Sequence, residues 1–326
     1  MSGKNIGFFV RHFTERGTEV AIYDYANYNE KMFNNRSFII CFTPEAQKKM
    51  KLPTIRHSYE KFNSRFKIIE INSIDDMKHV IMKYNLTYFY TLTHGGKDIY
   101  KFNDSKIWGK CKTIKHCVFN TKVQDADINI SISEWVDPKG KILPHMIDLP
   151  NHVLNLKREL NIPDNKIIIG NYGGPTSFDN PEVHNAIIKY LSKNDEIIFL
   201  FMNNSVFKYK HKNIINLERN LDLNHKVKFI NSCDAMIHGR KHGETFGLAV
   251  GEFSIKNKPV ITSKTHGDKQ HIANLENKAI LFDSEKNLIN IFADIKNIIN
   301  SRNDWNAYHD YSPDKVMEKF NTIIFQ

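Results

Sequence analysis

The sequence predicts an α/β protein made of two domains, each built around a parallel β-sheet. Two observations lead to this fold class. Short runs of β-branched and aromatic residues alternate with longer stretches of helical periodicity along the whole chain. This alternation starts again after residues 137–152, where Pro and Gly interrupt the periodicity. With 326 residues, of which 41% are hydrophobic, the chain is long enough to bury two ordinary cores.

The first half of the chain contains six candidate strands. They are residues 5–10, 37–42, 66–71, 87–92, 115–119 and 128–133. The clearest helical pattern between them is GTEVAIYDYANYNEKMF, residues 17–33, which keeps one apolar face. We expect these elements to form a Rossmann-like domain over residues 1–146.

The second half repeats the same logic over residues 147–305. Its candidate strands are residues 166–172, 196–202, 213–218, 235–239, 259–263 and 279–282. The terminal segment SPDKVMEKFNTIIF begins with Ser-Pro and continues as an amphipathic repeat. It predicts a closing helix within residues 306–326.

Composition argues against several classes of protein. The longest apolar runs, such as EIIFLFM, are far shorter than the ~20 residues that a bilayer-spanning helix needs. The first residues lack the apolar core of a secretory signal, so we expect cytoplasmic residence. The four cysteines show neither a CxxC pair nor ligand-like spacing with histidine, which predicts reduced, packed thiols. They are Cys41, Cys111, Cys117 and Cys233.

The net charge of +10 suits nucleic acid, an anionic membrane surface or a phosphate-bearing ligand. The lysines are scattered, however, and no arginine-rich tract interleaves with aromatic residues. The sequence also uses Lys, Asn and Ile heavily, which favours a coding bias as the source of the positive charge. We therefore expect no nucleic-acid partner and at most a weak peripheral association with a membrane.

The stretch HGETFGLAVGEF, residues 242–253, follows a predicted strand and leads through a glycine-bearing loop into a helix starting near Gly247. Backbone N–H groups at such a helix start, together with the helix dipole, form an anion site that a diphosphate fits. Gly243 and Gly247 allow the backbone to approach a ligand closely. The N–H groups concerned are those of Thr245, Phe246, Gly247 and Leu248.

Two glutamates flank this turn. Glu244 precedes it and Glu252 follows, and eight residues of helix span about 12 Å, so the two carboxylates cannot address one atom. They suit the two ends of an elongated ligand, such as a ribose diol and a hexose. The spacing alone occurs by chance about once in such a chain, and Glu252 would then be a solvated helix residue and Glu244 an acid of the first helical turn. The glycines, the preceding strand and the following KPVITS strand favour a binding site.

The segments ETFGLAVGE and KPVITSKTHGDKQHI resemble the retaining GT-B glycosyltransferases similar to family 4. The first-half segment RHFTERGTEVAIYDYA resembles the early loop of the same family. Together these segments extend the resemblance over most of the chain. It implies two Rossmann-like domains facing across a cleft, with the C-terminal helix returning to the N-terminal domain.

The resemblance also implies roles for individual residues. Glu252 would bind the ribose hydroxyls, Glu244 the ring hydroxyls of the donor sugar, and the 245–248 N–H groups the diphosphate. Gly17 and Thr18 would approach the donor, and His116 would lie against the donor sugar. That His116 is merely a structural histidine, in the core or on the surface, is an equally good interpretation. His94 and Lys97, in HGGKD, would help to form the acceptor pocket, although a plain Gly-Gly turn is favoured there.

Two departures from the family pattern concern the donor. The loop GNYGGPTSFDNPE carries Asn171, followed by Gly173, where the family has an arginine, and no lysine follows until Lys189. The diphosphate still needs positive charge as its bond to the sugar breaks. Arg240 and Lys241 are the cations nearest to Glu244 in the sequence. For Lys241, an ordinary solvated surface position is an equally good interpretation. The THGDKQHI loop lacks the double glycine of the family, which leaves the donor sugar open.

The sequence thus predicts transfer of a sugar from a nucleotide-diphosphate donor to an acceptor hydroxyl of a glycan, lipid or small molecule, with retention of configuration. The expected partners are the nucleotide sugar and a glycan or lipid-linked acceptor. No cofactor and no metal are expected, because N–H groups and cations would carry the diphosphate. Two alternatives stay open: a sugar-nucleotide epimerase of the same architecture, and a non-catalytic basic module that binds nucleic acid.

Overall fold

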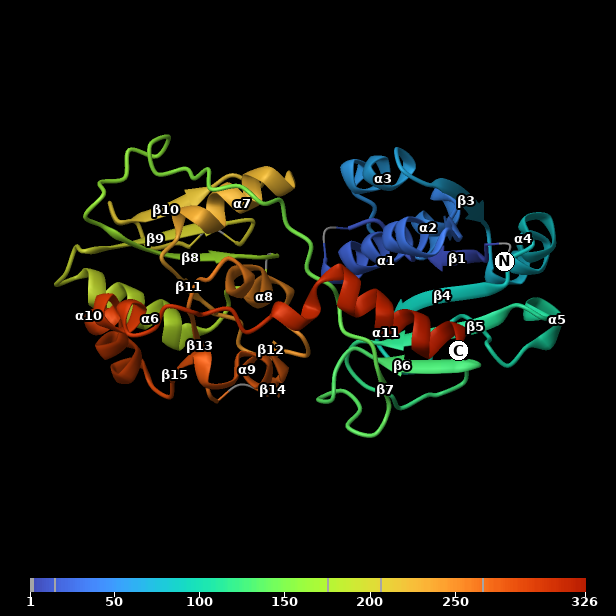
Figure 1. The fold of residues 1–326 in the computed structure, drawn as a ribbon. Helices are drawn as coiled ribbons and strands as arrows, with labels where there is room; N and C mark the ends of the chain where they lie inside the picture. Colours follow the sequence, from blue (N-terminus) through green and yellow to red (C-terminus); the bar gives the residue numbers. More distant parts are fainter. Residues whose placement is uncertain (1–2, 15, 175, 206, 266) are drawn as a thin grey trace. The chain divides into compact units, whose positions relative to one another are not determined.

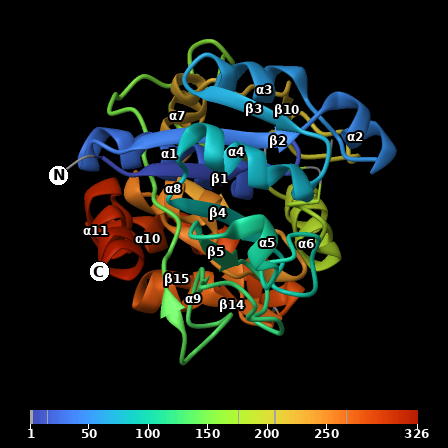
Figure 2. The same ribbon diagram turned by 90° about the vertical axis from the view of Figure 1, so that its right-hand side faces the viewer.

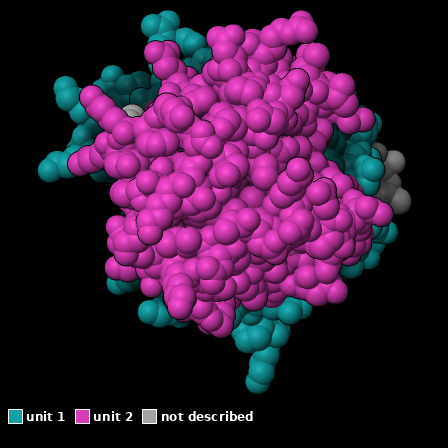
Figure 3. Space-filling model, turned by 90° about the vertical axis from the view of Figure 1, so that its left-hand side faces the viewer, with its two compact units in different colours: residues 1–146, 313–326 teal, residues 147–312 magenta. Residues whose placement is uncertain are grey.

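The computed structural model describes residues 3–14, 16–174, 176–205, 207–265 and 267–326. The chain divides into two compact units, coloured separately in Figure 3. Unit 1 comprises residues 1–146 and 313–326, and unit 2 comprises residues 147–312. Each unit has its own parallel sheet and its own hydrophobic core.

Unit 1 contains a seven-stranded sheet in the order β3-β2-β1-β4-β5-β6-β7, and all its neighbouring strands are parallel (Figure 1). The order reverses between β1 and β4, which places the loops after these strands at the switch point where doubly wound sheets bind ligands. The strands are β1 (Asn5–Phe9), β2 (Arg36–Phe42), β3 (Lys67–Ile71), β4 (Tyr88–Thr93), β5 (Lys112–Cys117), β6 (Ile128–Ser131) and β7 (Lys141–Ile142).

The helices of unit 1 include one from the end of the chain. They are α1 (Gly17–Phe33), α2 (Pro44–Lys49), α3 (Arg56–Asn63), α4 (Met77–Tyr84), α5 (Ser105–Trp108) and α11 (Pro313–Phe325), with a 3-10 turn η1 (Ile74–Asp76). Helix α11 lies against α1 (Figures 1 and 2). The rings of Tyr25 and Phe320 stack there at 5.6 Å, and both side chains are fully buried. This apolar face, rather than helix propensity, ties the C-terminal helix to the first unit.

Unit 2 contains a six-stranded parallel sheet in the order β10-β9-β8-β11-β13-β15, and its order reverses between β8 and β11. The strands are β8 (Ile167–Tyr172), β9 (Ile197–Met202), β10 (Ile214–Leu217), β11 (Ala235–Ile237), β13 (Val260–Ser263) and β15 (Ala279–Phe282). A separate two-stranded ribbon pairs β12 (Gly243–Glu244) with β14 (Asp268–Lys269). The helices are α6 (Pro181–Leu191), α7 (Leu223–Ser232), α8 (Leu248–Ile255), α9 (Gln270–Leu275) and α10 (Glu285–Asn300), with 3-10 turns η2 (Glu276–Lys278) and η3 (His309–Tyr311).

All twelve predicted strands are present, with ends that shift by a few residues. The largest shift is in β5, which begins at Lys112 rather than Lys115 because Thr113 and Ile114 are also buried against the neighbouring strands. The predicted helix at residues 17–33 has the same bounds in the structure. Helix α11 begins at Pro313, and residues 306–312 belong to unit 2, where Tyr308 is buried beside α8.

The prediction of reduced, packed cysteines is confirmed, since all four thiols are free and buried. Burial raises the pKa of both Cys41 and Cys111 to about 12, so these thiols are unreactive at neutral pH. Among the described helices, none combines the length and the apolar character needed to cross a bilayer.

Candidate functional site

The turn before helix α8 is the centre of the candidate site. Strand β11 lies at the reversal of the sheet order, and residues 238–247 lead from it into α8, which begins at Leu248. Gly247 caps this helix with a φ of 87°, a left-handed conformation that strains other residues. A Cβ atom added there would lie 3.0 Å from the Cβ of His271 and 3.3 Å from that of Val250. The turn therefore requires glycine for its own conformation and packing, and the predicted close approach of a ligand stays a prediction.

The first N–H groups of α8 have no partner within the helix, and the helix dipole adds partial positive charge beside them. Thr245, Phe246 and Gly247 are buried, and Leu248 is half-buried. The side chain of Phe246 packs against Tyr308 and Tyr311, with ring centroids at 5.8 and 5.1 Å. Its carbonyl accepts a hydrogen bond from the Tyr308 hydroxyl at 3.0 Å. The phenylalanine thus fixes the turn from the core, and only its backbone remains for a ligand.

Glu244 lies in strand β12 and is held by two groups that precede it. Its Oε2 is 2.6 Å from Nη1 of Arg240, and its Oε1 is 3.5 Å from Nε2 of His238. The side chain of Glu244 is 23% exposed, so a ligand can still reach it. Burial, reinforced by the charge of Arg240, lowers the pKa of His238 to about 3, which keeps that ring neutral.

Glu252, on α8, is buried and paired with a lysine that the sequence analysis did not identify. Its Oε1 lies 2.8 Å from Nζ of Lys226 on α7, and the two side chains are 8% and 9% exposed. Burial by itself would lower the pKa of Lys226, but the carboxylate of Glu252 and the hydroxyl of Tyr172 raise it above its ordinary value. The Lys226 ammonium also lies 4.9 Å from the Tyr172 ring centroid. Within the described residues, Oε2 of Glu252 has no hydrogen-bond partner.

Asn171 stands where the family pattern has an arginine, and it lies at the end of strand β8, next to the following loop. Asn171 is 1% exposed; its Nδ2 donates to the carbonyl of Ile237 at 2.6 Å, and its Oδ1 accepts from Asn204 at 2.7 Å. This side chain therefore ties β8 to β11. Gly173 follows it, and a Cβ there would lie 2.4 Å from Oγ of Ser177. Lys241 is exposed, and its backbone N–H donates to Asp179.

The predicted donor-contacting residues of the first half lie at the start of α1 in unit 1. Gly17 is the first residue of the helix. The Thr18 hydroxyl donates to the carboxylate of Glu19 at 3.0 Å, and Thr14 donates to the same carboxylate at 2.8 Å. Glu19 is 4% exposed and also lies 3.5 Å from Nε2 of His12. The sequence analysis missed this buried carboxylate, which the GTEVAIYDYA segment contains.

His116 lies inside strand β5 and is fully buried. Its Nδ1 is 2.6 Å from the hydroxyl of Tyr90, and its ring centroid lies 6.1 Å from that of His145. Burial, with the nearby His145, lowers the pKa of His116 well below its usual value. The side chain is thus a neutral histidine in the core of unit 1, and a contact with the donor sugar stays a prediction.

The HGGKD loop follows strand β4, and its turn depends on Gly95. This residue has a φ of 100°, and a Cβ there would lie 1.4 Å from the carbonyl oxygen of Asn120. His94 is exposed; its ring lies 4.9 Å from that of Phe119, and its Nδ1 is 3.0 Å from Nδ2 of Asn120. Lys97 is exposed in the same loop. Two neighbouring loops, after β4 and after β5, therefore meet around His94.

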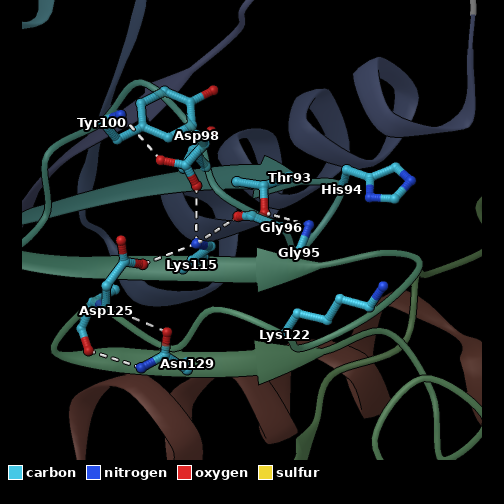
Figure 4. Close-up of polar contacts among 12 residues, drawn as sticks. Thr93, His94, Gly95, Gly96, Asp98, Tyr100, Lys115, Lys122, Asp125 and Asn129 are labelled. Atoms are coloured by element: carbon cyan, nitrogen blue, oxygen red, sulfur yellow. Dashed lines mark hydrogen bonds and ion pairs between the residues drawn. The ribbon is translucent and has the colours of Figure 1, made fainter.

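A buried lysine holds these two loops together. Figure 4 shows Lys115 between Asp98 and Asp125, with the carbonyl of Gly96 beside it. Its Nζ lies 2.9 Å from Asp98 and 2.8 Å from Asp125, and the side chain is 0% exposed. Burial by itself would lower the pKa of Lys115, but the two aspartates raise it above its ordinary value. The signal for this residue was a lysine inside an apolar strand, which must be paired if it is buried.

The predicted site residues thus fall into two groups, one in each unit. Arg240, Glu244, the 245–248 turn and Glu252 lie together in unit 2, whereas Gly17, Thr18, His94, Lys97 and His116 lie in unit 1. No cluster of three or more His, Cys, Asp or Glu side chains suited to a metal ion occurs in the described part of the chain.

Comparison with known proteins gives the following. No protein-family model matches the chain. The O-antigen biosynthesis glycosyltransferase WclY of Escherichia coli is 30% identical over 146 residues, which cover 40% of this chain and 39% of that protein. The match therefore spans well under half of this curated relative.

Solved structures match over nearly the whole chain. A glycosyltransferase from Rickettsia africae has a TM-score of 0.72 at 15% identity, covering 99% of this chain and 98% of that one. HepE from Anabaena, solved in complex with UDP-glucose, has a TM-score of 0.69 at 14% identity, covering 99% and 100%. A putative UDP-N-acetylglucosamine 2-epimerase from Listeria monocytogenes reaches 0.55 at 13% identity, covering 99% and 96%. These likenesses show the fold, and the chain has the expected GT-B architecture of two Rossmann-like sheets.

Proposed function

We propose that this protein is a retaining glycosyltransferase that moves a sugar from a UDP-sugar to an acceptor hydroxyl. The observation that carries the proposal is the α8 turn of unit 2, where Gly247 caps a helix start between two anchored carboxylates, Glu244 and Glu252. The matching fold of HepE, solved with UDP-glucose, and the partial match to WclY support it.

In this proposal the diphosphate binds the N–H groups of residues 245–248, where the helix dipole favours negative charge. Glu252 accepts a ribose hydroxyl at its Oε2 atom, which has no hydrogen-bond partner within the described residues. Lys226 keeps the other oxygen of that carboxylate fixed. Glu244, half-buried and held by Arg240, accepts hydroxyls of the donor sugar. Glu244 lies before the turn and Glu252 lies on the second turn of α8, so we assign them to different ends of the donor.

Arg240 is the cation that we assign to the leaving diphosphate. Its guanidinium has five N–H donors, and the described contact with Glu244 uses Nη1. The side chain is 31% exposed, so it remains accessible to a phosphate oxygen. Lys241 is exposed beside it and is the second candidate. Asn171 is a neutral amide that bonds to Ile237 and Asn204, so it supplies no charge.

In the front-face route that the family resemblance implies, the acceptor attacks from the face that the diphosphate leaves, and configuration is retained. The leaving phosphate oxygen takes the acceptor proton, and the sugar passes through an oxocarbenium-like state. The protein then acts by positioning and by stabilising charge on the diphosphate. We place the acceptor, a glycan or a lipid-linked sugar, near His94 and Lys97, on the loop that Gly95 and Lys115 hold in shape.

The first test is a thermal-shift panel of UDP, GDP, ADP and TDP sugars. A donor at 100 times its dissociation constant stabilises the folded protein by about 2.7 kcal/mol. We expect a UDP-sugar to give the largest shift, and Glu252→Gln to weaken UDP binding by about tenfold, the value of one hydrogen bond. Absence of a shift with all four nucleotides would overturn the proposal.

The second test is turnover of the Arg240→Ala variant with the donor found by the panel. We expect a loss of about 100-fold in kcat if Arg240 stabilises the leaving diphosphate. Turnover equal to that of the unmodified enzyme would refute this role, and Lys241→Ala would then be measured in the same way.

A sugar-nucleotide epimerase is the second candidate, because a putative epimerase shares the fold. The two functions differ in their need for an acceptor. Incubation with a labelled UDP-sugar alone would yield an epimerised sugar from an epimerase, whereas a transferase would release at most a hydrolysed sugar of unchanged configuration.

A further inference from the structure

Three buried polar side chains extend inward from Glu244, and none of them belongs to the motif around it. His238 follows β11, Thr262 lies in β13, and His271 lies in α9; they are 3%, 0% and 0% exposed. The Thr262 hydroxyl is 3.0 Å from Nδ1 of His238 and 3.0 Å from Nε2 of His271. The other nitrogen of His238 is 3.5 Å from Oε1 of Glu244. Three elements thus contribute to a single line of contacts that ends at the carboxylate.

The donor and acceptor capacities of these groups determine the direction in which the hydrogen bonds are donated. Thr262 has one hydroxyl proton, so it donates to one imidazole and accepts from the other. If it donates to His271, Nδ1 of His238 carries the proton and a lone pair of Nε2 faces the Glu244 carboxylate, which is repulsive. If it donates to His238, the Nε2 proton of His238 faces Glu244. The second arrangement satisfies the three contacts described above, and it makes His271 the donor to Thr262.

Both sides of the Glu244 carboxylate are then held. Arg240 contacts Oε2 at 2.6 Å, and neutral His238 faces Oε1. Burial, together with the Arg240 charge, keeps the pKa of His238 low, so the ring is neutral and carries a single proton. A carboxylate with two fixed donors cannot rotate freely, and its remaining lone pairs point in set directions.

The same helix that carries His271 also supports the α8 turn. A Cβ on Gly247 would lie 3.0 Å from the Cβ of His271, so the His271 side chain packs closely against the turn. His271 therefore contacts the helix start through its Cβ and reaches Glu244 through Thr262 and His238.

We propose that His271, Thr262 and His238 form a hydrogen-bonded relay that positions the Glu244 carboxylate for the sugar part of the donor. The inference rests on the proposed function, since it gives the relay its purpose. These three are positioning residues that act through Glu244. The relay is predicted to affect recognition of the sugar and to leave recognition of the nucleotide unchanged.

The test compares Thr262→Val with Thr262→Ser. Valine keeps the shape of threonine but removes the hydroxyl, whereas serine keeps the hydroxyl. Calorimetric titrations with UDP-glucose and with UDP separate sugar recognition from nucleotide recognition. We expect Thr262→Val to weaken UDP-glucose binding by about tenfold and to leave UDP binding within about twofold. Thr262→Ser should bind both as the unmodified protein does.

Equal losses for UDP and UDP-glucose in Thr262→Val would mean that the hydroxyl has a general structural role, and no loss for either would mean that the relay does not act on Glu244. Both results overturn the proposal. The nitrogen chemical shifts of His238 give a readout that needs no ligand. A proton on Nε2 supports the relay, and a proton on Nδ1 contradicts it. If the unmodified protein binds neither UDP nor UDP-glucose, the proposed donor is wrong, while the histidine measurement still decides whether the relay exists.

Discussion

The ammonium of Lys226 on α7 lies 2.8 Å from the carboxylate of Glu252 on α8, and both side chains are more than nine-tenths excluded from water. The two residues are 26 positions apart in the sequence. Their pairing explains how Glu252 can be ionised inside unit 2, because an isolated charge there would be strongly disfavoured. It also fixes one oxygen of the carboxylate that we assign to the ribose.

Lys226→Met should destabilise the protein by about 3–5 kcal/mol, because it leaves the Glu252 charge buried without a partner. Lys228→Met, on the same helix, is the matched control. Lys228 pairs at 3.7 Å with an exposed Glu159, so its loss should change the free energy of unfolding by less than about 1 kcal/mol. Urea unfolding of both variants measures the difference. Similar values for the two would show that the buried pair has no special importance.

Gly247→Ala should reduce stability by about 1–3 kcal/mol, because alanine is strained at a φ of 87° and its Cβ would crowd His271. Gly96→Ala is the control, since its Cβ would meet no atom within 4 Å. Thermal unfolding should show a clear loss for the first and little change for the second. If both variants unfold alike, the left-handed turn is not a constraint on the sequence.

Acid should destabilise unit 1 through its buried histidines. Burial lowers the pKa of His145 to about 3 and that of His116 well below 6.5. The unfolded chain gains protons at these groups as the pH falls through 6.5, whereas the folded chain does not. The stability is therefore fully present above that pH and is lost as the pH falls towards the folded values. Each histidine should remove about 2 kcal/mol between about pH 7.5 and pH 5.

Denaturant unfolding at several pH values tests this expectation. His145→Gln should reduce the pH dependence by the share of one histidine, because glutamine does not titrate. His79→Gln, at an exposed position of α4, should leave it unchanged. An unaltered pH dependence in His145→Gln would mean that the folded protein protonates this side chain without cost.

Lys115→Met should loosen the HGGKD loop as well as destabilise unit 1. The substitution leaves Asp98 and Asp125 facing a neutral side chain in a buried position, at a cost of about 3–5 kcal/mol. Hydrogen exchange at the amides of Gly95 and Gly96 should be faster in this variant than in the unmodified protein, under conditions where the protein as a whole stays folded. Lys101→Met removes an exposed pair with Asp75 and should have little effect on either measurement. Unchanged exchange in Lys115→Met would refute the bridging role.

Chelation should leave donor turnover unchanged. In the proposed mechanism the α8 N–H groups and Arg240 carry the diphosphate charge, so EDTA removes nothing that the reaction needs. Turnover of the donor is measured with EDTA and again with added Mg²⁺. A loss with EDTA that Mg²⁺ restores would show that a divalent ion assists the leaving group.

The strand and helix pattern could be predicted because it depends on neighbours in the sequence. Residues 17–33 form a helix with the predicted bounds, and the glycine at position 247 caps α8 where the HGETFG motif indicated. Both features follow from local periodicity and from the backbone freedom of glycine. A short segment of the sequence is enough to recognise either of them.

The pairing of charged side chains could not be predicted in this way. Lys226 and Lys115 read as ordinary lysines, yet each lies against buried carboxylates from another element. The sequence likewise did not indicate that the Asn171 side chain bonds to Ile237 in the neighbouring strand, and its contact with the donor stays a prediction. Which residue meets which depends on strand order and register, and these are set by burial of the whole apolar face.

The amino-acid order by itself determined the two Rossmann-like sheets and the glycine turn between two glutamates, because apolar periodicity and backbone conformation are local properties. The packed structure reveals that Lys226 holds Glu252 and that buried His238 faces Glu244, whereas the Arg240–Glu244 pair spans only four positions of the sequence. The physical reason is that a buried charge selects its partner by distance in space. That distance exists only once the parallel strands and their helices have packed.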